Sequence, residues 1–490
     1  MTVLSRPVWP WALAAAALGA LAVVQPIAAV AALAGAVLLL VAVAAPRTTV
    51  GLAVLAALFV RPLMHLVPVP ELSYLDEAMV LLCAFVLPLR RLAARRSLRV
   101  FPGQWWFAGF VVAGLLGGLF LGVAPDIFLT GAFVTAKGLV FAWAVAQVDW
   151  EERHLRSAAR AGVVLIGFCL VATAANFVLE DSWNAFMASD ENAVQARGAL
   201  PSLVGPFSHP IDLGQFMSLS AIALTAWRAA VRKSALTFVL MIATAFGSVL
   251  SARRTAIGSL VAAWIWVKAV TRSKGALLAV AVCAPLAAVV LATPISTVVT
   301  ETYQEYLDPN AATSAARTVL TIGSFDVAAD HFPLGAGFGR YGSATAAENY
   351  SPEYVVRGFP DVWGLGRTAE DGRFLTDTEW PAIIGESGFL GTIAFVAGLV
   401  AIYLAARRLW RSSRPPLLRW VGLVTIGWMV ACLVQSVATV TFTGPPVFSL
   451  FFGLAGIVAA LSDADRSGGD HSRSTPEPES RLRVSSTRSA

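Results

Sequence analysis

Two adjacent arginines are the first residues whose type and spacing could support chemistry. Arg253 and Arg254 lie in the segment Ser251–Thr255, directly before an apolar run. Arginine offers a planar fork that binds phosphate oxygens, and a helix N-terminus also favours anions. The alternative role is an anchor at the membrane surface. Because the topology derived below places both residues outside, where arginine is less common, we predict an anion-binding site.

A third arginine and a histidine lie in a segment with helical spacing. Residues 313–331 predict an amphipathic helix, and Arg317 and His331 share one face about four turns apart. For His331, a structural hydrogen bond is as well supported as catalysis. Arg340 follows in the glycine-rich segment Gly335–Tyr341, which lacks the βαβ surroundings of a dinucleotide site. We expect that segment to form a turn close to a ligand or to a membrane surface.

Carboxylates gather where the next apolar run begins. Asp377 and Glu379 directly precede it, and Glu386 lies about two turns inside it. An acidic residue within a membrane span suggests function by its cost. The alternatives are helix capping by Asp377 and, for Glu386, a structural role as a cap or as the partner of an arginine. Three further charges in or near apolar runs are expected to pair: Arg61, Lys137 and Asp212.

The composition defines which elements position these residues. The chain has 490 residues, of which 57% are hydrophobic and 13% charged, with a mean hydropathy of +0.71. Soluble domains are about a quarter charged, so a soluble globular enzyme is excluded. The predicted fold is an all-α, polytopic transmembrane helix bundle in the cytoplasmic membrane. The net charge of +6 does not indicate nucleic acid, because the charges lie in short loops between apolar runs.

Apolar runs predict about 12–14 spans of roughly 20 residues each. Most arginines and lysines fall in loops that this count places inside, so the positive-inside rule predicts that both termini are cytoplasmic. The large loop 299–379 then lies outside. The predicted spans are 9–25, 27–46, 49–67, 74–90, 104–123, 128–149, 161–179, 211–230, 235–251, 255–271, 276–298, 380–406, 416–436 and 443–462.

The chain divides into four regions by the same pattern. Residues 1–200 are N-terminal transmembrane helices, 201–406 form a core that includes the outer loop 299–379, 407–462 are C-terminal transmembrane helices, and 463–490 form a disordered cytoplasmic tail. All four cysteines fall within apolar runs and share no metal-ligand spacing. We therefore expect no disulfide, no metal and no cofactor; the cysteines are Cys83, Cys169, Cys283 and Cys432.

Four segments stand in a recognisable order along the chain. They are Gly205–Pro210 with Leu213 and Gly214, Ala252–Ala256, Arg317 with Asp330–Gly337, and Asp377–Trp380 with Glu386–Gly391. In this order they resemble the O-antigen ligase and O-antigen/exopolysaccharide polymerase superfamily of bacterial membrane glycosyltransferases. The resemblance covers roughly residues 200–400. Where the family often has histidine followed by asparagine, this chain has Asp377 and Thr378.

The resemblance implies a reaction on the outer side of the cytoplasmic membrane. The donor is a glycan on a polyprenyl diphosphate in the bilayer, the acceptor is a glycan or lipid hydroxyl, and other polysaccharide-assembly proteins are further possible partners. Nucleic acid is not one. Preorganised arginines stabilise the leaving diphosphate, and a carboxylate near the acceptor hydroxyl, Asp377 or else Glu379, serves as the general base. The implied catalytic residues are Arg254, Arg317, Asp377, Glu379 and His331, and the implied substrate-binding residues are Arg253, Arg340, His209 and Glu386.

Other functions remain open at this point. A transporter or flippase for a lipid-linked glycan or an anionic solute fits the charges within spans and the broken apolar runs, although repeated halves are not evident. A polyprenyl-phosphate-sugar mannosyltransferase wants an acidic pair in a large first outer loop, where this chain has only Gln25 and Pro26. Ligation of a finished chain and polymerisation of repeats use nearly the same donor chemistry, so the sequence leaves both open.

Overall fold

A computed structural model describes residues 26–67, 69–189, 194, 201–271, 312–368 and 370–471. These residues form sixteen α-helices and two short 3₁₀ helices, and no strand occurs among them. The helices are α2 (Pro26–Ala44), α3 (Pro46–Leu66), η1 (Pro70–Tyr74), α4 (Leu75–Ala93), α5 (Gln104–Phe120), α6 (Pro125–Ala146), α7 (Glu152–Val178), α8 (Glu180–Met187), α9 (Pro210–Ala230), α10 (Ala235–Leu250), α11 (Arg254–Val270), α14 (Ala312–Asp330), α15 (Ala344–Glu348), α16 (Pro352–Val356), η2 (Phe359–Asp361), α17 (Trp380–Ser412), α18 (Pro416–Gln435) and α19 (Val447–His471).

The all-α fold class predicted from composition is confirmed. Every predicted span within the described residues lies on a helix, whereas the runs at 9–25 and 276–298 lie outside them. Six helical segments are long and apolar enough to cross a membrane, so the chain is a candidate multi-pass membrane protein. They are Pro46–Leu66, Pro70–Ala93, Pro125–Ala146, Glu152–Val178, Trp380–Ser412 and Pro416–Gln435.

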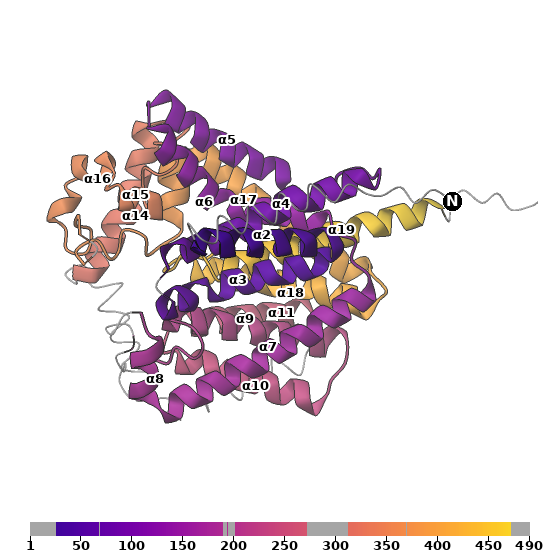
Figure 1. Ribbon diagram of the computed structural model, residues 1–490. Helices are drawn as coiled ribbons and strands as arrows, with labels where there is room; N and C mark the ends of the chain where they lie inside the picture. The colour runs from indigo at the N-terminus through magenta and orange to yellow at the C-terminus, as the bar shows by residue number, and fades with distance from the viewer. Residues whose placement is uncertain are drawn as a thin grey trace, which may run out of the picture.

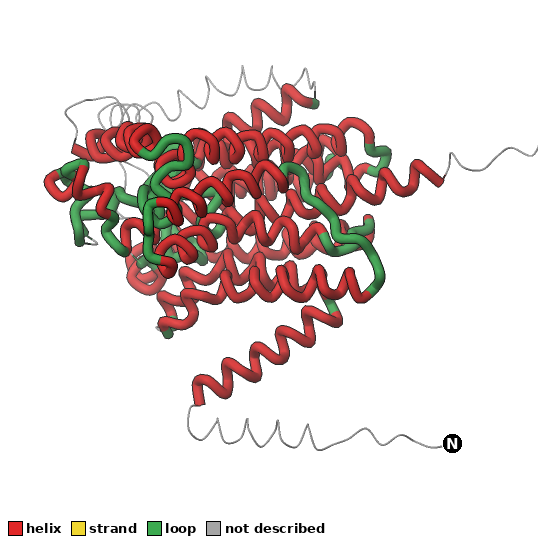
Figure 2. Tube along the Cα trace, turned by 90° about the horizontal axis from the view of Figure 1, so that it is seen from above, coloured by secondary structure: helices red, strands yellow, loops and turns green. Residues whose placement is uncertain are grey.

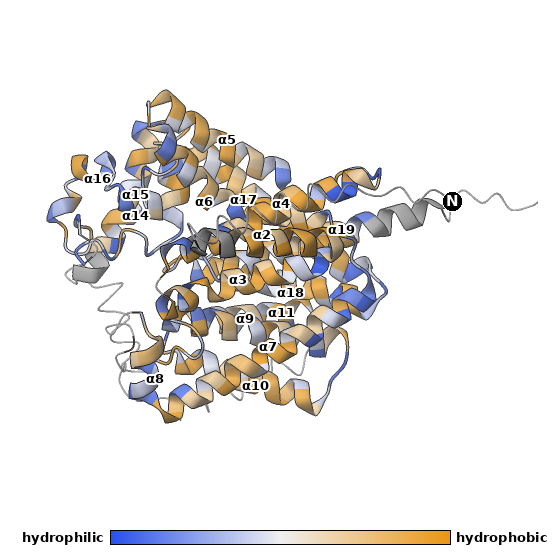
Figure 3. Cartoon of the chain, viewed as in Figure 1, coloured by the Kyte–Doolittle hydropathy of each residue, from blue (hydrophilic) through white to orange (hydrophobic). Residues whose placement is uncertain are grey.

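Four shorter apolar helices accompany these six: Ala32–Ala44, Gln104–Phe120, Ala235–Leu250 and Val447–Asp463. The long helices lie side by side with loops at both ends (Figure 2). Apolar residues cover most of their length, and hydrophilic residues gather toward the ends (Figure 3). Apolar side chains therefore cover the bundle between two polar ends, as a protein that crosses a bilayer requires.

The outer loop folds over one end of the bundle, which we call the outer end. Helices α14, α15 and α16 lie there together with α8 (Figure 1). The helix predicted at 313–331 is confirmed as α14, Ala312–Asp330. Residues from α14, α16 and the intervening loops enclose a small core of their own, whose buried members include Leu320, Tyr341, Tyr354 and Phe359. This part of the loop is thus an ordered unit; residues 299–311 lie outside the described residues.

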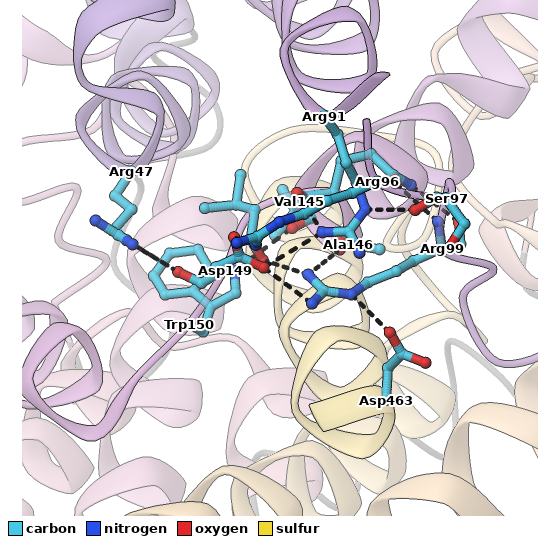
Figure 4. A network of polar contacts seen from close by, with 12 residues as sticks. Arg47, Arg91, Arg96, Ser97, Arg99, Val145, Ala146, Asp149, Trp150 and Asp463 are labelled. Atoms are coloured by element: carbon cyan, nitrogen blue, oxygen red, sulfur yellow. Dashed lines mark hydrogen bonds and ion pairs between the residues drawn. The ribbon is translucent and has the colours of Figure 1, made fainter. Parts of the chain in front are cut away.

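An arginine network lies at the opposite end, which we call the inner end, between the end of α4 and the start of α7; Figure 4 shows its contacts from close by. Asp149, between α6 and α7, accepts hydrogen bonds from Arg96 at 2.5 Å, Arg99 at 2.9 Å and Arg91 at 3.3 Å. Burial alone would raise the pKa of Asp149, but these guanidinium groups hold it below its ordinary value. The charges that the topology assigned to the cytoplasm therefore hold the α4–α5 loop against the start of the α6–α7 connection.

The C-terminal helix α19 continues to His471 and so enters the segment that the sequence predicted as a disordered tail. An apolar run ends near Leu461, which is why composition placed the boundary there, but the helix runs on through the polar residues that follow. Residues 472–490 of the predicted tail lie outside the described residues.

The glycine-rich turn after α14 is wedged between transmembrane helices. Gly337 has φ +87°, and a Cβ there would lie 2.3 Å from Cα of Gly118 in α5. A Cβ at Gly335 would lie 2.3 Å from the backbone nitrogen of Gly388 in α17. The N–H of Gly337 also donates to the carbonyl of Glu386 at 3.0 Å. The expected turn is therefore present, and its glycines serve close backbone packing against α5 and α17.

Candidate functional site

Arg317 and Asp377 form an ion pair at the outer end. Arg317 lies on α14 and Asp377 shortly before α17, so the pair joins the outer loop to the bundle. Nε of Arg317 donates to Oδ2 of Asp377 at 2.7 Å, and Nη2 donates to the same oxygen. The guanidinium also lies 5.1 Å from the ring centre of Phe374. The two side chains are 16% and 23% exposed, so this ion pair is partly accessible at the end of the bundle that the loop covers.

Glu379 is buried and fastens the segment between α18 and α19. Its Oε2 accepts the backbone N–H groups of Thr441 at 2.5 Å and Phe442 at 2.9 Å. Its Oε1 accepts the hydroxyl of Thr443 at 2.9 Å. Burial raises the pKa of Glu379, although these hydrogen bonds oppose the rise. Because both oxygens are engaged in the fold, Asp377 is the better placed of the two predicted bases.

Glu386 fastens the turn that carries Arg340. Its side chain is 1% exposed, and Oε1 accepts the backbone N–H groups of Arg340 at 3.0 Å and Tyr341 at 3.1 Å. The hydroxyl of Ser343 donates to the same oxygen at 2.6 Å. The sequence left two alternatives for Glu386, a functional acid or a structural cap or arginine partner. Its carboxylate accepts backbone N–H groups, as a cap does, and so holds the backbone at Arg340.

A second polar cluster surrounds Glu353, a residue that the sequence analysis missed. Its Oε1 lies 3.1 Å from Nε2 of His331 and 3.6 Å from Nη2 of Arg340, and its Oε2 accepts Nη1 of Arg357 at 2.5 Å. Glu353 is 8% exposed. We call His331, Arg340, Glu353 and Arg357 the Glu353 cluster. Its one signal in the sequence is the spacing of Glu353 and Arg357, which permits an ion pair within a helix.

The two clusters stand at opposite ends of α14. Arg317 lies near its start and His331 directly after its last residue, which separates their backbones by roughly 20 Å at the usual rise per residue. Side chains on a helix tilt toward its N-terminus, so Arg317 points away from His331. The shared face predicted for these residues therefore carries two separate polar sites. The contact between His331 and Glu353 favours the hydrogen-bonding alternative for this histidine.

Arg253, Arg254 and His209 stand where other helices begin. α11 starts at Arg254 with Arg253 as its N-cap, and both side chains are half-buried. His209 is the N-cap of α9, and its Nδ1 accepts the N–H of Ile211 at 3.1 Å. The sequence thus placed all three correctly at helix N-termini.

Helix α18 links these helix starts to the Arg317–Asp377 pair. It packs against α9, α11 and α17. Nε2 of Gln435, its last residue, donates to the hydroxyls of Ser218 on α9 at 3.1 Å and Ser259 on α11 at 2.7 Å. The carbonyl of the next residue, Ser436, accepts the N–H of Glu379 at 3.3 Å. Arg254, His209 and Asp377 therefore belong to neighbouring elements at one end of the bundle.

The remaining charges within apolar runs form pairs, as predicted. Arg61 donates to Asp212 at 2.9 Å. Nζ of Lys137 on α6 donates to Asp76 at 2.8 Å and to Glu77 at 2.6 Å on α4. Lys137 and Asp76 are almost completely buried. Pairing of this kind is how charged residues are retained inside a helix bundle.

Taken together, the described residues form an all-α candidate multi-pass membrane protein with ion pairs and polar clusters at both ends of its helix bundle. Comparison with models of known protein families and with curated proteins finds no match to this chain. Within the described residues, no group of three or more histidine, cysteine, aspartate or glutamate side chains is arranged to hold a metal ion.

Proposed function

We propose that this protein is a membrane glycosyltransferase that transfers or polymerises a polyprenyl-diphosphate-linked glycan on the outer side of the cytoplasmic membrane, in the manner of an O-antigen ligase or polysaccharide polymerase. The observation that carries the proposal is the Arg317–Asp377 pair. Both Nε and Nη2 of Arg317 donate to one carboxylate oxygen. A diphosphate oxygen requires the same planar donor edge. The pair also brings together an arginine that would bind the diphosphate and a carboxylate that would act as the base, which are the two groups that this reaction needs.

Arg317 and Asp377 together account for the charge and the proton that the proposed reaction moves. The acceptor hydroxyl attacks the anomeric carbon, and the bond from that carbon to the diphosphate oxygen breaks. The diphosphate leaves with the electron pair, and Asp377 takes the hydroxyl proton as general base. Arg317 and Arg254 stabilise the charge that develops on the leaving group. Because the diphosphate and Asp377 compete for the same edge of Arg317, donor binding releases the carboxylate when it is needed.

The other residues support this centre in distinct ways. Glu379 and Glu386 hold the segments around it through hydrogen bonds to backbone N–H groups. Arg340 and His331, held by Glu353, lie beyond the end of α14, far enough from Arg317 to bind a part of the glycan away from the diphosphate. Arg253 stands beside Arg254, and His209 stands at the start of α9; both contribute to donor binding.

Arginine variants test the proposal. Arg317→Ala should lower product formation by about 10²–10³-fold, the usual cost of removing one charge-stabilising donor. Arg317→Lys should recover little, because lysine lacks the planar fork. The lipid-linked donor should accumulate in cells that carry either Arg317 variant. Arg156→Ala is the matched control, since Arg156 is exposed on α7 at the inner end. Wild-type product from Arg317→Ala at equal protein level would refute the assignment.

The buried ion pairs favour one competing function, a transporter or flippase. Lys137 with Asp76 and Glu77 places three ionisable groups among the helices, and such groups often mark transport pathways. Purified protein in vesicles separates the two functions. A flippase moves lipid-linked glycan between leaflets without forming product, whereas a glycosyltransferase forms product and releases polyprenyl diphosphate without moving its donor. Analysis of surface polysaccharide in a deletion strain then distinguishes a polymerase from a ligase. Loss of a polymerase leaves single repeats, whereas loss of a ligase leaves finished chains on the lipid carrier.

A further inference from the structure

The outer loop contains a hairpin loop, residues 362–368 and 370–375, that is fixed at several points. The N–H of Phe374 donates to the carbonyl of Gly364 at 3.0 Å, and the N–H of Gly366 donates to the carbonyl of Asp371 at 2.8 Å. Two leucines near its ends, 365 and 375, are buried in the small core of the outer loop. The loop is therefore held in one conformation by its own backbone and by apolar anchors.

This hairpin loop displays a tryptophan that the fold leaves accessible. Trp363 is 51% exposed, and its ring centre lies 5.4 Å from that of Phe374 with the planes inclined by 55°. Gly364 permits this arrangement, because a Cβ there would lie 2.2 Å from the Phe374 ring. The guanidinium of Arg373 lies 5.3 Å from the Trp363 ring centre.

The aromatic pair leads directly to the proposed reaction centre. Phe374 contacts both Trp363 and the guanidinium of Arg317, and Arg317 binds Asp377. An unbroken series of contacts thus runs from an exposed indole to the proposed base. A half-exposed tryptophan removes less apolar surface from water than a core residue does. Folding alone therefore does not explain why it stands beside the pair.

We infer that Trp363, Phe374 and Arg373 form a binding platform for a sugar ring next to the Arg317–Asp377 pair. The face of an aromatic ring carries negative charge, and the C–H groups on one face of a pyranose carry partial positive charge, so the two stack. Arg373 supplies several N–H donors for sugar hydroxyls. A platform held rigid before binding loses little entropy when the sugar arrives.

The inference rests on the proposed function and names the part of the substrate bound beside the diphosphate. The sugar belongs either to the lipid-linked donor or to the acceptor glycan, and both present the same pyranose chemistry. Three probes separate these cases. Undecaprenyl diphosphate carries the lipid and diphosphate without sugar, glycan fragments released from the surface polysaccharide carry sugar without lipid, and the extracted lipid-linked glycan carries both.

The test measures binding of each probe to the full chain in lipid nanodiscs. Trp363→Ala should weaken binding of a sugar-bearing probe about tenfold, or ~1.4 kcal/mol, and should leave undecaprenyl diphosphate unaffected. Trp363→Phe keeps an aromatic face and should restore part of the loss. Trp105→Ala is the matched control, because Trp105 is 74% exposed on α5 at the inner end. Weakening with the released fragments assigns the sugar to the acceptor, and weakening with the lipid-linked glycan alone assigns it to the donor.

Two outcomes would overturn the platform. One is wild-type binding of both sugar-bearing probes by Trp363→Ala. The other is an equal loss for all three probes that Trp363→Phe does not restore, which marks a general disturbance of the loop. The proposed function fails separately, if Arg317→Ala binds undecaprenyl diphosphate as tightly as the wild-type chain does.

Discussion

Replacing Gly337 with alanine tests whether the turn after α14 is held as tightly as its contacts indicate. The added Cβ would lie 2.3 Å from both Cα and N of Gly118, so backbone atoms would have to move. Overpacking of this kind costs about 1–3 kcal/mol. At φ +87°, a side chain also costs roughly 1–2 kcal/mol. The sum is about 2–5 kcal/mol, a large part of a stability that is typically about 5–15 kcal/mol.

The assay is thermal unfolding of the purified protein in detergent, with Gly122→Ala as the matched control. Gly122 also has positive φ, +61°, but an added Cβ there meets no atom within 4 Å. The control therefore carries only the backbone term of roughly 1–2 kcal/mol. We expect Gly337→Ala to unfold at a clearly lower temperature than Gly122→Ala. Equal unfolding temperatures for the two variants would refute the close packing of the turn against α5.

Three further predictions address the base, the inner end and the topology. Asp377→Asn should lower turnover by about 10²–10⁴-fold with donor binding intact, and Asp377→His should restore measurable turnover; wild-type turnover in Asp377→Asn would favour capping instead. The pKa of Asp149 is lowered in the folded chain. Its contribution to stability is therefore present above its unfolded pKa of about 3.9 and is lost as pH falls through the folded value. In acid-unfolding measurements, the wild-type chain should accordingly lose its stability advantage over Asp149→Asn at low pH. A cysteine at exposed Glu348 should react with an impermeant maleimide in intact cells and one at exposed Arg95 only after lysis; the reverse pattern would invert the topology and remove the active-site argument.

Hydrophobic patterning predicts most of the bundle because each span satisfies its backbone hydrogen bonds within one helix. The signal is local, so apolar length alone located the helices. α14 was predictable for a related reason, since its amphipathic spacing is also local. The end of α19 was not, because the residues after Leu461 are polar and composition gave no reason for the helix to continue to His471.

The individual candidate residues could be selected from the sequence, but the contacts between them could not be predicted. Arg317 and Asp377 are sixty positions apart in the sequence, and no pattern in the chain indicates that they pair. Glu353 was missed because it lies on a helix of only five residues, too short to show periodicity. The glycines of the turn were expected to lie close to a ligand or to a membrane surface, because the same backbone freedom also permits close packing against a neighbouring helix.

The position of these glycines bears on how the outer loop works with the bundle. Gly337 and Gly335 fix the start of the returning chain against α5 and α17, and Glu386 holds the next turn through its backbone. Asp377 joins the other end of α14 to the start of α17 through Arg317. The outer loop is thus fastened to α17 at both ends of α14. The contacts of the turn with α5 and α17 therefore hold Arg317 on α14 near Asp377, which precedes α17, even when donor binding releases the ion pair in the proposed reaction. Stabilisation of a leaving group requires such fixed positions.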